Sequence, residues 1–103
     1  MWAQLITTRL KQGHEADMPR LVEQLKVTEQ PGSGLIRSIA MQDQKDPSKV
    51  YMLVLFESED AARARENDER RQAGLQAARA TMAEIFDGPP EFVDLTVVEE
   101  FAP

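Results

Sequence analysis

Cysteine is absent from the 103-residue sequence, and histidine occurs only once, at His14. The lack of cysteine excludes disulfides, thiolate nucleophiles and cysteine-ligated zinc or iron–sulfur sites. One histidine is too few for a histidine-rich metal cage within one chain. The sequence also contains no P-loop, no GxGxxG motif and no Ser/His/Asp arrangement. We therefore expect neither a metal nor a cofactor.

A basic excess and a long hydrophobic run are missing as well. The chain has 12 lysines and arginines against 18 aspartates and glutamates, so its formal net charge is −6. Nucleic-acid-binding modules usually carry a basic excess, so nucleic acid is not an expected partner. No apolar run is long enough to span a bilayer, and the start, MWAQLITTRL, lacks the layout of a signal peptide. These features predict a cytoplasmic protein that has no membrane partner.

The hydrophobic content of 42% and the length predict a single globular domain over residues 1–103. Apolar and β-branched segments predict four strands, and apolar residues at helical spacing predict two helices. The strands are Trp2–Leu10, Leu35–Gln42, Val50–Phe56 and Glu91–Phe101, and the helices are Glu15–Gln30 and Glu59–Phe86. The second helix should break within the polar stretch ENDERR. This β-α-β-β-α-β order predicts a ferredoxin-like α+β fold, in which a four-stranded antiparallel sheet has both helices on one face.

The third predicted strand is apolar on both of its faces. Val50, Met52, Val54 and Phe56 share one face, and Tyr51, Leu53 and Leu55 share the other. In the second strand, Leu35, Ile39 and Met41 are expected to point inward, together with Arg37. Helices cover only one face of such a sheet, and soluble monomers rarely expose a contiguous apolar patch. The pattern therefore predicts a homodimer that packs sheet against sheet through Tyr51, Leu53 and Leu55, unless the C-terminal tail covers this face.

Three segments carry a resemblance to a known family: ITTRLKQGHEADMPRL, PGSGLIRS and VYMLVLFESEDAARA. They resemble the antibiotic biosynthesis monooxygenase-like domains of the dimeric α/β-barrel superfamily, and the resemblance covers nearly the whole chain. It implies a homodimeric α/β barrel. Family members include cofactor-free oxygenases that act on phenolic polyketides, and also haem-degrading enzymes.

The haem-degrading branch uses an asparagine on the first strand, a tryptophan at the end of the third strand and a histidine in the following helix. Aligned on Gly13, these positions fall at Ile6, at Phe56 and at or beside Arg65. All three residue types are absent, and no imidazole is left there to ligate haem iron. Haem degradation is therefore not expected.

Six residues are candidates for contact with a ligand, although no catalytic residue can be named. They are Gln4, Thr8, Arg37, Phe56, Arg65 and Met82. Gln4 and Arg65 would orient oxygen atoms of a ligand, Thr8 offers a hydroxyl, and Phe56 and Met82 would shape a pocket. The charge of Arg37 must meet either a ligand anion or an acidic residue such as Asp94.

Each candidate also has a plainer interpretation. Methionine and aromatic residues at these spacings are often ordinary core. Arg63 and Arg70 each follow a glutamate by four residues, which is typical of a solvated helix face. His14 follows a glycine turn and is read as an exposed residue.

Two functions remain open on this basis. The resemblance implies a cofactor-independent monooxygenase or isomerase that acts on a small aromatic or polyketide-like molecule. The missing site residues favour the alternative, a non-catalytic small-molecule-binding or interaction module.

Overall fold

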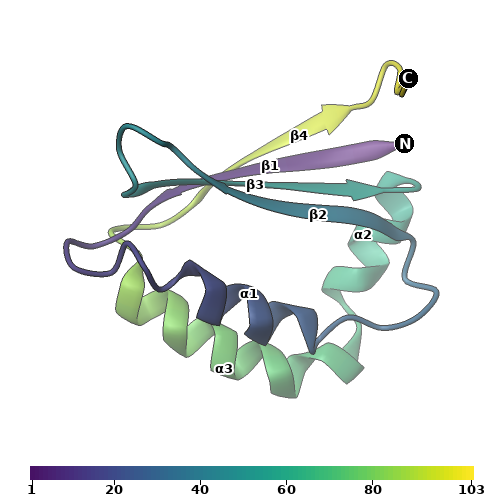
Figure 1. The fold of residues 1–103 in the computed structure, drawn as a ribbon. Helices are drawn as coiled ribbons and strands as arrows, with labels where there is room; N and C mark the ends of the chain where they lie inside the picture. The colour runs from purple at the N-terminus through teal and green to yellow at the C-terminus, as the bar shows by residue number, and fades with distance from the viewer.

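The computed structural model describes all residues from 1 to 103, and its four strands form one antiparallel sheet (Figure 1). The strands are β1 (Trp2–Arg9), β2 (Leu35–Gln42), β3 (Lys49–Phe56) and β4 (Glu91–Thr96), in the spatial order β2-β3-β1-β4. The helices are α1 (Met18–Lys26), α2 (Glu59–Glu66) and α3 (Glu69–Ile85). All three lie on one face of the sheet, with α1 and α3 packed side by side. The predicted ferredoxin-like fold is confirmed.

The predicted break in the second helical region separates α2 from α3. Ser58 begins α2, because its hydroxyl accepts a hydrogen bond from the Ala61 N–H at 3.1 Å. Asp68 begins α3 in the same way, accepting from the Arg70 N–H at 2.9 Å. Asn67, the C-cap of α2, lies between them and is a weak helix former. Side-chain capping therefore divides this region into two helices.

Two elements are shorter than the sequence predicts. Helix α1 ends at Lys26, and the Leu25 carbonyl there accepts from the Thr28 hydroxyl at 2.7 Å and from the Thr28 N–H at 3.1 Å. Strand β4 ends at Thr96 rather than Phe101, because Thr96 pairs with Trp2, where β1 begins. Beyond that point one further hydrogen bond joins the two segments, from the Val97 N–H to the Met1 carbonyl at 3.3 Å.

The core lies between the sheet and the helices in two clusters. The larger cluster contains Leu10, Met18, Leu21, Val50, Ala78 and Ile85. The smaller cluster contains Trp2, Val54, Phe56 and Ala62, with the Trp2 and Phe56 ring centroids 6.0 Å apart. As predicted, the even-numbered residues of β3 point toward the helices.

A β-bulge changes which residues of β2 point toward the helices. Leu35 pairs with Phe56, but the next pair joins Arg37 to Leu55, so Ile36 is an extra residue. A shift of one residue turns every later side chain to the opposite face. The prediction that Arg37, Ile39 and Met41 point inward is therefore wrong, and these three share the open face of the sheet with Leu55, Leu53 and Tyr51.

The open face of the sheet is apolar and is not covered by the chain itself. Ile39, Met41, Val93 and Leu95 are all exposed there. The C-terminal tail follows β4 without further secondary structure, and Val98 and Phe101 are 95% and 90% exposed. The alternative that this tail covers the open face is therefore wrong.

Gly34 permits the close approach of the loop before β2 to helix α2. Its φ is +82°, and a Cβ placed there would lie 2.6 Å from the Ala61 Cβ. Gly32 has a similar φ of +75° but has open space around it. In both Gly→Ala variants the left-handed backbone costs roughly 1–2 kcal/mol, and in Gly34→Ala overpacking adds roughly 1–3 kcal/mol.

We expect Gly34→Ala to lower the Tm more than Gly32→Ala does, by about 4–8 °C for each additional kcal/mol. Thermal unfolding followed by circular dichroism measures the difference. Equal Tm values for the two variants would show that the contact between Gly34 and Ala61 does not limit the packing.

Candidate functional site

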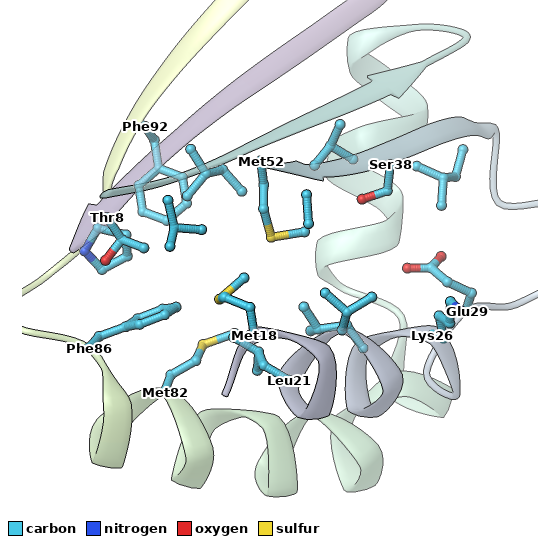
Figure 2. A pocket seen from close by; sticks show the side chains of 18 of the residues that line it. Thr8, Met18, Leu21, Lys26, Glu29, Ser38, Met52, Met82, Phe86 and Phe92 are labelled. Carbon is cyan, nitrogen blue, oxygen red and sulfur yellow. The ribbon is translucent and has the colours of Figure 1, made fainter. Parts of the chain in front are cut away.

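A cavity of about 250 Å³ lies between the inner face of the sheet and the helices α1 and α3 (Figure 2). Thirteen of its 20 lining residues are hydrophobic, among them Met18, Met52 and Met82. The volume is just below the range of about 300–1,000 Å³ typical of drug-sized ligands, which suits a small molecule. The bulge in β2 helps to open this space, because it turns the small Ser38 and Ala40 toward the helices.

Charged side chains gather at one end of the cavity, where Figure 2 shows Glu29 and Lys26. Arg65 binds the Glu29 carboxylate with two donors, its Nε at 3.1 Å from Oε2 and its Nη2 on Oε1. The Nη2 of Arg71 lies 3.8 Å from the same Oε1. Two guanidinium groups therefore share one carboxylate, which leaves an excess positive charge.

Arg71 is 5% exposed although it carries a charge. Its Nη1 donates to the Arg65 carbonyl at 3.1 Å, its Nη2 lies 3.4 Å from Thr28 Oγ1, and its Nε has no partner. Burial lowers the pKa of Arg71, and the neighbouring charge of Arg65 lowers it further, against the opposing effect of Glu29. An arginine nevertheless keeps its proton near neutral pH, so Arg71 carries a buried positive charge at this end of the cavity.

The opposite end of the cavity is uncharged. Figure 2 shows Thr8 there, beside Phe86 and Phe92. Thr8 is only 9% exposed, and its hydroxyl has no hydrogen-bond partner in the protein. A buried hydroxyl without a hydrogen-bond partner lowers stability, and such groups are expected at functional positions.

Of the six candidates from the sequence, three line the cavity and three do not. Thr8, Arg65 and Met82 line it. Phe56 lies next to it in the core, where its ring supports the Arg65 guanidinium at 5.4 Å. Gln4 and Arg37 lie elsewhere.

Gln4 belongs to an exposed polar cluster, and its Nε2 donates to Asp94 Oδ1 at 3.0 Å. Asp94 also accepts from Arg63 at 3.0 Å, and the Arg63 guanidinium lies over the Trp2 ring. Asp94 therefore pairs with Arg63 rather than with Arg37. Arg37 is exposed on the open face because of the bulge in β2.

The charged end is also lined by three residues that the sequence did not predict as site residues: Glu29, Arg71 and Lys26. Arg71 belongs to the polar stretch ENDERR, in which the spacing of Arg70 favours a solvated helix face. However, Arg71 precedes the buried Ala78 and Ile85 by seven and fourteen residues, a spacing that places all three on one helix face. Glu29 follows α1 in a loop and carries no comparable signal.

No group of three or more histidine, cysteine, aspartate or glutamate side chains is arranged to hold a metal ion. Haem also finds no imidazole here, because His14 is not among the lining residues and Ile6 and Arg65 occupy two of the positions noted above. None of the helices has the length and hydrophobicity needed to cross a membrane.

Two buried threonines allow the unpaired hydroxyl to be tested. We expect Thr8→Val to leave the free energy of unfolding unchanged or to raise it, because the Thr8 hydroxyl has no partner. Thr28→Val should lower it by roughly 1–3 kcal/mol, because the Thr28 hydroxyl contacts the Leu25 carbonyl and lies 3.4 Å from Arg71 Nη2. Urea unfolding measures both, and equal losses would contradict the assignment of partners.

The family model for antibiotic biosynthesis monooxygenases matches residues 1–77. No curated protein matches the sequence. Among solved structures, a Nitrosomonas europaea protein provisionally assigned as an antibiotic biosynthesis monooxygenase is 14% identical with a TM-score of 0.77, over 96% of this chain and 100% of that one.

A Bordetella bronchiseptica protein with the same provisional assignment is 21% identical with a TM-score of 0.73, over 95% of this chain and 97% of that one. A point mutant of SnoaB, a cofactor-independent oxygenase from Streptomyces nogalater, is 13% identical with a TM-score of 0.71, over 99% of this chain and 98% of that one. At these identities the structures establish the shared fold. Since the family model covers most of the sequence, the chain belongs to the antibiotic biosynthesis monooxygenase family.

Proposed function

We propose that the chain is a homodimer whose cavity binds a small aromatic or polyketide-like molecule and oxidises it with O2 without a cofactor. The observation that carries the proposal is the cavity itself, which has mostly apolar walls and charged groups at one end only. The family and a structural neighbour described as a cofactor-independent oxygenase support the reaction class.

An oxygenase without a cofactor uses its substrate as the reductant of O2. Loss of a proton from an acidic carbon leaves an electron pair, which forms a new C–O bond to O2. The resulting peroxide anion takes up a proton to become a hydroperoxide. The hydroperoxide then loses the remaining hydrogen of that carbon together with its terminal OH as water, which leaves a carbonyl group. Apolar walls favour this route because they exclude water from the reacting carbon.

The residues of the cavity fit separate roles in this reaction. Arg65 would stabilise a substrate oxygen on which negative charge develops, because its guanidinium is held by Glu29 and Phe56. Met82 and Phe86 would shape the space for the ring system. At the uncharged end, Thr8 would form a hydrogen bond with a polar atom of the ligand. Its side chain would first have to rotate, because its hydroxyl is buried and has no partner in the protein.

A second candidate, a binding module without catalysis, is favoured by the absence of a free base. Glu29 is the only carboxylate among the lining residues, and Arg65 occupies both of its oxygens. No histidine or tyrosine lines the cavity. Proton removal would then depend on bound water or on the acidity of the substrate.

The open face of the sheet supports the proposed dimer. Tyr51, Leu53 and Leu55 lie at its centre on β3, and Ile39 and Val93 lie exposed on the two edge strands. The tail leaves this face uncovered. Burial of each large apolar side chain there would stabilise the pair by up to about 1.5–3 kcal/mol.

Anthrone tests the reaction, because it has an acidic carbon and reacts with O2 to give anthraquinone and water. We expect the protein to raise oxygen uptake by at least about tenfold over the protein-free rate, since positioning and charge stabilisation each contribute that much or more. Ala40→Phe, which fills the cavity, should remove the effect. Ala83→Phe, on the exposed side of α3, is the control.

An oxygen electrode measures the rate, and calorimetry measures binding. Binding without oxygen uptake would favour the second candidate. Failure of anthrone either to bind or to react would contradict the proposal for this ligand class.

The dimer is tested by light scattering during size-exclusion chromatography. We expect the wild type to show twice the subunit mass of 11.6 kDa. Leu53→Asp should be monomeric, because an unpaired carboxylate would lie in an apolar contact. Val27→Asp, at a residue 76% exposed at the end of α1, should remain dimeric. A monomeric wild type, or a dimeric Leu53→Asp variant, would contradict the proposed interface.

A further inference from the structure

We infer that the charged end of the cavity recognises a carboxylate on the ligand, so that the chain takes a small aromatic or apolar monocarboxylate. This inference rests on the proposed binding function and narrows it to one chemical class. It concerns Arg65 and Arg71, whose guanidinium groups share Glu29.

The charges at this end do not balance. Glu29 is the one acidic side chain that either Arg65 or Arg71 contacts as an ion pair. Glu66, next to Arg65 in the sequence, pairs with Arg63 at 3.0 Å. The charge of Asp68 raises the pKa of Arg71, but its two oxygens bind Arg70 through Nε at 3.0 Å and Nη2 at 2.7 Å. Lys26, which also lines the cavity, pairs with the exposed Glu23. Arg65 and Arg71 therefore share one ion-pair partner, and one of their two positive charges has no carboxylate of its own in direct contact.

The surface arginines show the opposite arrangement. Arg63 alone meets three carboxylates, those of Glu59, Glu66 and Asp94, at 3.0–3.2 Å. Its side chain is well exposed, so water would already solvate its charge. The exposed Arg63 thus has three carboxylate partners, whereas the enclosed Arg65 and Arg71 share one. An ionic group held away from water without a full counterion is costly, and a bound anion would offset that cost.

The shape of the site fixes how such a ligand would lie. Guanidinium groups match a carboxylate with paired donors, and Arg65 is held in place by Glu29 and by the Phe56 ring. Beyond this end the cavity is lined mostly by apolar side chains, and Ser38 and Thr8 are its only other polar lining residues. Only one end is cationic, so the carboxylate would bind there and the apolar body would fill the rest of the cavity.

A matched pair of ligands tests the inference: 2-naphthoate, an anion, and 2-naphthylmethanol, its neutral counterpart of similar shape. Calorimetry at low salt should show that 2-naphthoate binds the wild type about tenfold more tightly or better, as expected for charge-assisted hydrogen bonds. Arg65→Gln should bring the affinity for 2-naphthoate down to that for 2-naphthylmethanol. Added salt should also weaken the preference.

The Glu29→Gln variant is expected to bind 2-naphthoate more tightly than the wild type does. Misfolding would lower the affinity, so it cannot produce this result. Removing the protein's own carboxylate frees both guanidinium groups for the ligand. We expect the affinity for 2-naphthoate to rise about tenfold and that for 2-naphthylmethanol to stay unchanged. Circular dichroism of each variant checks the fold.

The outcomes separate this inference from the proposed function. Equal binding of the two ligands to the wild type would overturn the carboxylate assignment and leave the apolar binding site intact. An unchanged or reduced affinity of Glu29→Gln for 2-naphthoate would show that the arginine pair only ties the helices together, and would overturn the assignment too. If neither ligand binds the wild type, the inference and the proposed binding site both fail.

Discussion

The extra residue in β2 determines what both faces of the sheet present. Because Ile36 is unpaired, Ser38 and Ala40 turn toward the helices, and Ile39 and Met41 turn outward. With the regular register, the larger side chains would fill the space beside α1 and the small ones would lie on the open face. A change of one residue in pairing therefore opens the cavity and also enlarges the apolar surface on the other side.

The cavity and its charged end carry costs that the rest of the fold must offset. Thr8 and Arg71 each bury a polar atom without a partner, and Arg71 also buries a charge. Each such group lowers stability by roughly 1–3 kcal/mol. The two core clusters and the ladder between β1 and β3 offset these losses. Local features that disagree with an otherwise consistent fold are expected at functional positions.

Much of the fold follows from local sequence, and much of the site does not. The strand pattern of β3, the cap at Ser58 and the break near Asn67 depend on residues close in sequence, so they can be predicted. The bulge depends on how LIRSIAMQ pairs with another strand, and the end of β4 depends on where β1 begins. Both are tertiary properties.

The site residues also differ in whether local sequence or the tertiary fold determines their position. Thr8 and Met82 were accessible to reasoning about which face of a strand or helix they occupy. Arg71 could have been found from its spacing to Ala78 and Ile85, but its polar neighbours concealed it. Glu29 lies in a loop, and its contact with Arg65 joins residues 36 positions apart, so only the folded chain brings it to the cavity.

Strand β3 connects assembly to ligand binding, because its alternate residues serve the two faces. Val50, Met52 and Val54 line the cavity, whereas Tyr51, Leu53 and Leu55 lie on the open face. Strand β2 pairs with β3 at the edge of the sheet, and nearly all of its residues are exposed. Regions with few buried contacts open most easily. A second copy packed on Ile39 and Met41 would hold β2 against β3 and thereby fix the wall that Ser38 and Ala40 give to the cavity. Ligand affinity and dimer formation would then stabilise each other through this one edge of the sheet.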